Sequence, residues 1–205
     1  MQISQTDWPE TDFTEAVESL AQRHYAVIPD FLSPPMLKLL HDECLQRHEE
    51  GHFHAAAIGR AAGQQHNTGI RGDSICWLQP DFPAGGRYLQ RMADLQAILN
   101  RELYLGLRQF ETHYAHYLPG SFYKRHVDRH RDNDARVITA VCYLNPAWPD
   151  GAGGEIRVWN ARDEEVMTLA PQGGTLLLFT SHDIPHEVLP ADRLRLSMAG
   201  WFRRD

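Results

Sequence analysis

Apolar side chains recur at helical spacing in three segments of the first hundred residues, over 13–21, 33–44 and 88–103. Positions that repeat every three or four residues fall on one face of an α-helix, so these segments predict helices that pack on a core. The second segment opens with Ser33 and two prolines, a common helix start. Residues 25–28 are apolar and end in two β-branched side chains, Val27 and Ile28, which predicts one early strand.

From residue 108 onward the pattern changes to short β-rich runs separated by Gly, Pro, Asp or Asn. These runs cover 109–117, 121–128, 136–144, 155–159, 164–170, 174–180, 186–190 and 194–202. Many short strands after a block of helices predict a mainly β fold, a sandwich or jelly roll with the helices packed on one sheet. We expect a single domain over 1–205, with helical support over 1–107 and a β core over 108–205.

The segment 51–69 is rich in Ala, Gly, His and Gln and has almost no apolar periodicity. Ordered domains rarely keep so long a loop without a use. Two interpretations stay open at this point: a lid over a site, or a disordered insertion.

Composition excludes several classes of protein. The net charge of -7 and the pI near 5.9 disfavour nucleic acid and anionic lipid as partners. No apolar stretch approaches the roughly 20 residues that a membrane span needs. The 3 cysteines are scattered and odd in number, and the polar N-terminus lacks a secretory pattern, so we expect a cytoplasmic protein.

The 12 histidines invite a search for a metal site. His126 and Asp128 lie two apart in a predicted strand, so one metal can take both, and His186 at the start of a later strand supplies a third ligand. Two histidines and one carboxylate leave three open positions on iron, as in non-haem Fe(II) oxygenases, where a keto acid fills two and dioxygen the third. A second pair, His130 and Asp132, lies in a polar run that reads as a solvated turn, and His182 competes with His186 as third ligand.

Arg195 follows His186 by nine residues, in a strand of alternating character. One face of this strand is apolar, and the other carries Arg193, Arg195, Ser197 and Trp201. If the second face lines a barrel, a fixed guanidinium there can bind a dicarboxylate bidentately. The alternative is an edge strand with solvated arginines.

Six ordered blocks of the sequence resemble prolyl hydroxylases of the hypoxia-inducible-factor type, in a compact bacterial form. The likeness covers about 70–77 and 113–202. The blocks are Ile70–Trp77 (with Ile-Arg-Gly-Asp and a closing Trp), Tyr117–Asp128, Ile138–Asn145, Gly153–Arg157, Pro185–Val188 and Arg195–Trp201.

The resemblance implies a double-stranded β-helix (a jelly-roll, cupin-like fold) with the N-terminal helices on one sheet. It makes His126, Asp128 and His186 the iron ligands. It further implies roles for residues that spacing alone does not assign. Arg195, Tyr143, Tyr117, Thr139 and Trp201 would bind or enclose 2-oxoglutarate, and Arg71, Asp73, Tyr123 and Ile156 would lie on the substrate side.

The implied reaction is hydroxylation of a prolyl residue in a protein, with 2-oxoglutarate and O2 consumed and succinate and CO2 produced. Fe(II) is the implied metal, and ascorbate is expected to support turnover. Compact bacterial relatives make elongation factor Tu the leading candidate partner. Two departures bear on the substrate: the polar turn after Asp128 is one residue longer, and the chain stops at Asp205 without the C-terminal helix of the animal enzymes.

Two other functions stay open. One is an oxygenase acting on a free amino acid or other small molecule, which should carry ionic contacts for both substrate termini. The other is a non-catalytic β-helix binding protein, which we expect to have lost a ligand or the basic residue. His126, Asp128, His186 and Arg195 are all present, which favours an enzyme, and an intact Asp128 disfavours a halogenase.

Overall fold

Two antiparallel sheets lie face to face in the computed structural model, which describes residues 8–56, 69–128 and 135–205. The larger sheet has seven strands in the order β1-β9-β6-β11-β4-β3-β2, and the smaller has four in the order β5-β10-β7-β8. The strands are β1 (Tyr25–Ile28), β2 (His54–Ala55), β3 (Ser74–Trp77), β4 (Gln109–Tyr117), β5 (Tyr123–His126), β6 (Arg136–Tyr143), β7 (Ile156–Trp159), β8 (Glu165–Leu169), β9 (Leu176–Thr180), β10 (His186–Val188) and β11 (Arg195–Arg203).

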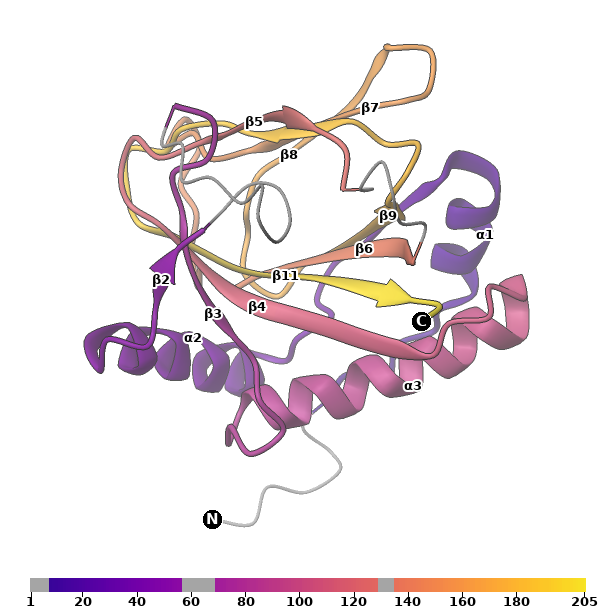
Figure 1. Cartoon of the computed structure of the whole chain (residues 1–205), viewed down its shortest axis with the longest axis horizontal. Helices are drawn as coiled ribbons and strands as arrows, with labels where there is room; N and C mark the ends of the chain where they lie inside the picture. The colour runs from indigo at the N-terminus through magenta and orange to yellow at the C-terminus, as the bar shows by residue number, and fades with distance from the viewer. Residues whose placement is uncertain (1–7, 57–68, 129–134) are drawn as a thin grey trace.

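Helices cover the outer face of the larger sheet. Figure 1 shows α2 (Pro34–Glu49) and α3 (Gly85–Leu103) beneath it, on the side away from the smaller sheet, with α1 (Thr14–Arg23) at the end of the sheet that carries β1 and β9. The main core lies between these helices and the sheet, where Met36, Leu99 and Phe202 are fully buried. The expected double-stranded β-helix with helices on one sheet is confirmed.

Local sequence signals placed most elements within a few residues. Strand β1 has the expected bounds, and the Ser33 side chain caps α2 by accepting a hydrogen bond from the Met36 amide at 3.3 Å. The expectation of one early strand was wrong, because β3 pairs with β4 and β2 pairs with β3, and both extend the larger sheet. Each strand is too short to show an alternating pattern. Each is formed by hydrogen bonds to a strand farther along the polypeptide. The proposed lid falls mostly on 57–68, outside the described residues.

A buried carboxylate from α2 holds the start of α3. Glu43 accepts hydrogen bonds from the amides of Ala84 and Gly85, at 2.7 and 2.8 Å, and from the Tyr114 hydroxyl at 2.7 Å. The N-cap residue Ala84 has no side chain able to satisfy these amides, so a distant residue replaces the usual local cap.

Strand β4 carries two buried histidines that are neutral at physiological pH. The His116 ring stacks on His48 of α2, with centroids 3.9 Å apart. Burial and the neighbouring His48 lower the pKa of His116 to about 4, and burial together with Arg71 lowers the pKa of His113 to about 4. Protonating either ring therefore lowers the stability of the folded state.

We expect the metal-free protein to lose stability as the pH falls from about 6.5, the unfolded-state pKa of histidine, towards 4. In that window the unfolded chain binds more protons than the folded one, so each buried histidine removes up to about 1.4 kcal/mol per pH unit. Urea unfolding at a series of pH values measures the slope. His116→Phe keeps a stacking ring and should flatten the slope relative to the wild type. Identical slopes in the two proteins would contradict this assignment.

Candidate active site

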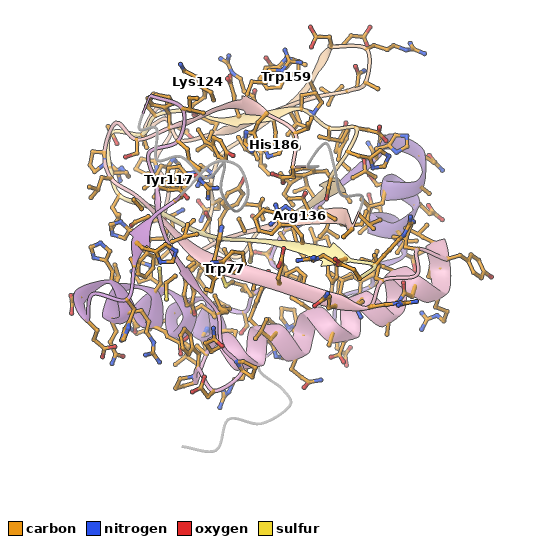
Figure 2. All side chains as sticks on the ribbon, viewed as in Figure 1. Trp77, Tyr117, Lys124, Arg136, Trp159 and His186 are labelled. Carbon is orange, nitrogen blue, oxygen red and sulfur yellow. The ribbon has the colours of Figure 1, made fainter. Side chains whose placement is uncertain are left out.

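A cavity of about 440 Å³ lies between the two sheets. Its wall includes eleven of the residues that the sequence singled out. They are Arg71, Asp73, Tyr117, Tyr123, His126, Asp128, Thr139, Ile156, His186, Arg195 and Trp201. In Figure 2, His186 and Tyr117 lie between the sheets, whereas Lys124 and Trp159 lie on the outer side of the smaller sheet. Alternation along the strands therefore directs polar side chains from both sheets into one space.

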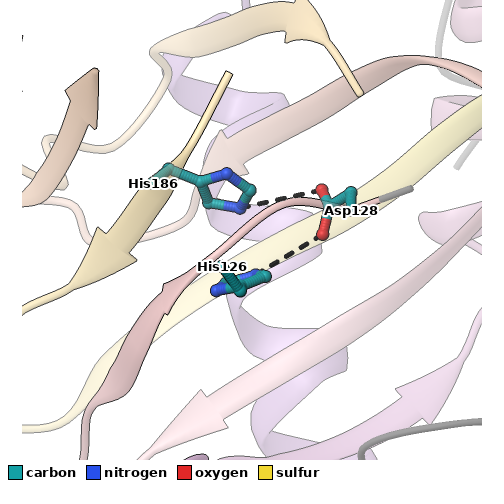
Figure 3. Close-up of side chains that lie close together, drawn as sticks. All are labelled: His126, Asp128 and His186. Carbon is teal, nitrogen blue, oxygen red and sulfur yellow. Dashed lines mark ion pairs between the residues drawn. The ribbon is translucent and has the colours of Figure 1, made fainter. Parts of the chain in front are cut away.

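Two histidines and an aspartate converge at the smaller sheet (Figure 3). His126 ends β5 and His186 begins β10, and the two residues are cross-strand partners. One ligand atom of each of the three side chains lies within 4.8 Å of the others. Nε2 of His126 is 3.5 Å from Oδ1 of Asp128, and Nε2 of His186 is 3.7 Å from Oδ2. Among the described residues no other group of three possible ligands comes this close.

Backbone carbonyls orient both imidazoles for metal binding. Nδ1 of His126 lies 2.8 Å from the Lys124 carbonyl, and Nδ1 of His186 lies 3.1 Å from that of Ile184. Because a carbonyl only accepts, Nδ1 of each ring carries a proton, and Nε2 is the atom left facing Asp128. Burial, with the neighbouring His126, lowers the pKa of His186 to about 4, so the ring is neutral at pH 7.

The Asp128 carboxylate is ionised. Its burial raises the pKa, but His186 and His126 outweigh that effect and hold the pKa of this carboxyl well below its usual range. A charged carboxylate and two imidazoles whose Nε2 atoms face it are a donor set that suits a divalent metal such as Fe(II).

Arg195 lies deep in the cavity, 2% exposed, at the start of β11. Its Nε donates to the Gly154 carbonyl at 2.8 Å and its Nη1 to the Ser197 hydroxyl at 3.3 Å. Its Nη2 and the Tyr143 hydroxyl are buried without a hydrogen-bond partner among the described residues. Leaving buried donors unpaired costs about 1–3 kcal/mol each, so this end of the cavity fits an anionic group such as a carboxylate.

Aromatic rings surround this basic group. The Arg195 guanidinium lies 5.1 Å from the Tyr117 ring centroid and 5.3 Å from that of Tyr143. Burial raises the pKa of Tyr143 to about 12, although Arg195 opposes the shift, so its hydroxyl stays a donor at neutral pH. Tyr143 lies behind the cavity surface and is fully buried.

The Arg-Gly-Asp segment forms a buried ion pair at the cavity wall. Nε and Nη2 of Arg71 donate to the two Asp73 oxygens at 2.6 and 2.8 Å. The Arg71 guanidinium also lies 4.7 Å from the centroid of Tyr123, whose ring stacks on His126 at 3.6 Å. This pair therefore supports the face of a candidate metal ligand.

Some predicted residues lie elsewhere. His182 is largely exposed, pairs with Asp183 at 2.7 Å and does not join the cluster of three. Arg193 precedes β11 and pairs with Asp192 at the surface, so its expected place on the cavity face was wrong. Thr139, by contrast, lies in the cavity wall, and its hydroxyl donates to Asp128 at 2.9 Å. His130 and Asp132 lie outside the described residues.

Sequence reasoning missed a charged network at the end of the cavity far from Arg195. Glu111 accepts from Arg136 at 3.0 Å and from Arg203 at 2.7 Å, and the Arg136 guanidinium lies 3.5 Å from the centroid of Trp201. The alternation of β4, where Glu111, His113, Ala115 and Tyr117 share a face, was the available signal.

Comparison with known proteins gives the class. The 2OG-Fe(II) oxygenase superfamily matches residues 112–203, the stretch that contains the three candidate ligands and Arg195. A Pseudomonas putida prolyl-4-hydroxylase structure is 41% identical, with a TM-score of 0.84, over 93% of this chain and 98% of that one. The chain therefore belongs to the 2-oxoglutarate- and Fe(II)-dependent oxygenase family, among its prolyl hydroxylase homologues.

Animal relatives agree with this placement. A prolyl hydroxylase from Trichoplax adhaerens, solved with a peptide of the hypoxia-inducible-factor oxygen degradation domain, is 27% identical with a TM-score of 0.80, over 92% of this chain and 87% of that one. The hypoxia-inducible factor prolyl hydroxylase of Caenorhabditis elegans is 28% identical over 91% of this chain. The chain spans 27% of that relative's length. In the described parts of the chain, no helix is both long and apolar enough to cross a membrane.

Asp128→Ala should weaken binding of Mn(II), a redox-stable substitute for Fe(II), by more than about 100-fold, because it removes a ligand rather than a supporting contact. Mn(II) is titrated into the protein, and electron paramagnetic resonance measures the concentration of free Mn(II) at each step, which gives the dissociation constant. Asp192→Ala changes an exposed carboxylate and should bind as the wild type does. Asp132→Ala tests the competing pair, and loss of binding there with retention in Asp128→Ala would show that the site is misassigned.

Proposed function

We propose that this protein is an oxygenase that hydroxylates a prolyl residue of a protein substrate, consuming 2-oxoglutarate and O2 and releasing succinate and CO2. One observation carries the proposal: a single cavity is lined by the His126, Asp128 and His186 cluster and by Arg195, whose Nη2 is unpaired beside the buried Tyr143. A metal-binding group and a carboxylate-binding group in one closed space are what a keto-acid oxygenase needs.

Each end of this cavity has a distinct task. Iron, when bound with its co-substrates, supplies the oxidising power. Nη2 of Arg195 and the hydroxyl of Tyr143 hold the distal carboxylate of 2-oxoglutarate through charge-assisted hydrogen bonds. Thr139 and Tyr117 line the same cavity as Arg195 and Asp128, and the aromatic rings near Arg195 limit the access of water, which strengthens these contacts.

Part of the remaining wall suits an apolar ring. Ile156 and Trp201 are buried residues of the cavity wall, and Trp77 beyond them is 37% exposed with its ring centroid 6.4 Å from that of Trp201. A prolyl ring carries no charge and no amide hydrogen, so such a surface accommodates it without leaving a polar group unpaired.

The charges of the cavity favour a peptide over a free amino acid. Arg71 is paired with Asp73, and Arg136 and Arg203 are paired with Glu111. A free amino acid needs unpaired partners for its ammonium and its carboxylate, and these pairs do not offer them. Relatives named as prolyl hydroxylases, one solved with a peptide, support the same choice.

Elongation factor Tu is the first protein to test as the substrate, and the cytoplasm the proposed place of reaction. Ascorbate is proposed to sustain turnover by keeping iron reduced. Arg71 and Asp73 are proposed to support the substrate side of the cavity together with Tyr123 and Ile156.

Arg195→Ala should raise the 2-oxoglutarate concentration needed for half-maximal turnover by at least about 30-fold. Truncating one partner of a buried charged pair costs about 2–5 kcal/mol. Mn(II) affinity should stay nearly unchanged, because Arg195 does not contact the metal cluster. Arg193→Ala is the matched control, since its guanidinium is at the surface. A larger effect of Arg193→Ala would refute the proposed carboxylate site.

The substrate class is tested by incubating the enzyme with Fe(II), 2-oxoglutarate, ascorbate and bacterial lysate, and in parallel with purified elongation factor Tu. We expect prolyl peptides that gain one oxygen, seen by mass spectrometry, and none with Asp128→Ala. Succinate formed only with free amino acids would point to the small-molecule alternative. Modification of lysate proteins other than elongation factor Tu would replace that partner and keep the proposed reaction.

A further inference from the structure

A chain of two hydroxyl groups leads from the core to the Asp128 carboxylate. Thr139 Oγ1 lies 2.9 Å from Asp128 Oδ2 and 2.9 Å from Ser181 Oγ. Thr139 is 1% exposed and Ser181 is fully buried, so water does not compete for these contacts. Thr139 lies on β6, whereas Ser181 directly follows β9.

Proton counting gives this chain one direction. An ionised carboxylate only accepts hydrogen bonds, so the single hydroxyl proton of Thr139 goes to Asp128. The contact between Thr139 and Ser181 then has Ser181 as donor and Thr139 as acceptor. A hydroxyl that accepts one hydrogen bond becomes a stronger donor in the next. Ser181 therefore strengthens the hydrogen bond from Thr139 to the Asp128 carboxylate.

This chain of hydrogen bonds also links the segments that carry two candidate ligands, Asp128 and His186, to strand β6. Ser181 opens the turn between β9 and β10 that leads to His186, and its amide donates to the Val137 carbonyl of β6 at 3.0 Å. Asp128 follows β5, an edge strand of the smaller sheet whose hydrogen-bonded neighbour is β10. Strand β6 lies inside the larger sheet between β9 and β11, so it is a rigid reference for both ligands.

We propose that Thr139 is a positioning residue for the metal site, and that Ser181 acts through it: together they hold Oδ2 of Asp128 and leave Oδ1 directed at the metal. This inference rests on the proposed function, since it assumes that Asp128 is a metal ligand. With one oxygen held, the carboxylate would offer a metal only Oδ1, which would leave more of the metal open to 2-oxoglutarate and O2. Hydrogen bonds that orient a ligand typically contribute about 10–100-fold to metal affinity.

The role differs from that expected from the family resemblance, which placed Thr139 beside 2-oxoglutarate. Thr139 lines the same cavity as Arg195, so both roles are sterically open. They separate by measurement: a positioning residue changes metal affinity in the absence of 2-oxoglutarate, whereas a co-substrate contact changes only 2-oxoglutarate affinity of the metal-loaded protein.

The experiment measures Mn(II) affinity without 2-oxoglutarate, by electron paramagnetic resonance, in a set of matched variants. Thr139→Val replaces the hydroxyl with a methyl group of similar size and should weaken Mn(II) binding about 10–100-fold. Thr139→Ser retains the hydroxyl and should restore affinity to within a few-fold of the wild type. Thr112→Val is the control, because Thr112 is a buried threonine of the larger sheet whose hydroxyl binds the Ala199 carbonyl instead.

Ser181→Ala tests the direction of the chain. It should weaken Mn(II) binding less than Thr139→Val, and the double variant should bind no worse than Thr139→Val alone, since Ser181 acts only through Thr139. Thermal unfolding of each variant verifies that it is folded before affinity is compared.

The outcomes are distinct. Wild-type protein that binds Mn(II) no better than Asp128→Ala would refute the proposed function itself. Normal wild-type binding with no change in Thr139→Val would refute the positioning role alone, as would a change confined to 2-oxoglutarate affinity. Additive losses from Thr139→Val and Ser181→Ala would refute the chain and leave two independent contacts.

Discussion

The structure depends on the place of β11 in the middle of the larger sheet, between β4 and β6. Successive side chains of a strand point to opposite faces, so β11 must satisfy two environments at once. Leu196, Met198 and Phe202 enter the core between the larger sheet and the helices. Arg195 and Trp201 face the cavity on the other side. A shift of one residue in register would bury an arginine among the helices, which makes this register strongly specified.

The cavity has opposite electrostatic demands at its two sites. Asp128 is kept ionised by neighbouring histidines, and Arg195 keeps a donor unpaired in a buried setting. The unpaired Arg195 donor opposes folding of the protein alone, because a desolvated polar group costs free energy when no partner meets it. In the proposed function a carboxylate supplies the partner that the Arg195 donor lacks, so the feature that opposes folding favours binding.

The support around the site is built from tertiary contacts. Thr139 on β6 holds Asp128, and Ile184 and Lys124 orient the two imidazoles through their carbonyls. Each of these contacts is made to one of the candidate metal ligands, at an atom other than the one that would face the metal. They restrict rotation of the three side chains, which is how residues on the short edge strand β5 and its neighbour β10 attain a defined geometry.

Periodicity and capping in the sequence determined the helices, the eight strands after residue 108 and the inward face of β11, because these features depend on neighbours in the chain. Spacing and alternation along predicted strands marked His126, Asp128, His186 and Arg195 as candidates, and the family motifs agreed. Only the tertiary structure decided that His182 and Arg193 lie outside the site, that β3 belongs to the larger sheet, and that Thr139 and Ser181 reach Asp128. Such contacts join residues far apart in the chain, and their partners are selected by sheet register and burial, which no local pattern encodes.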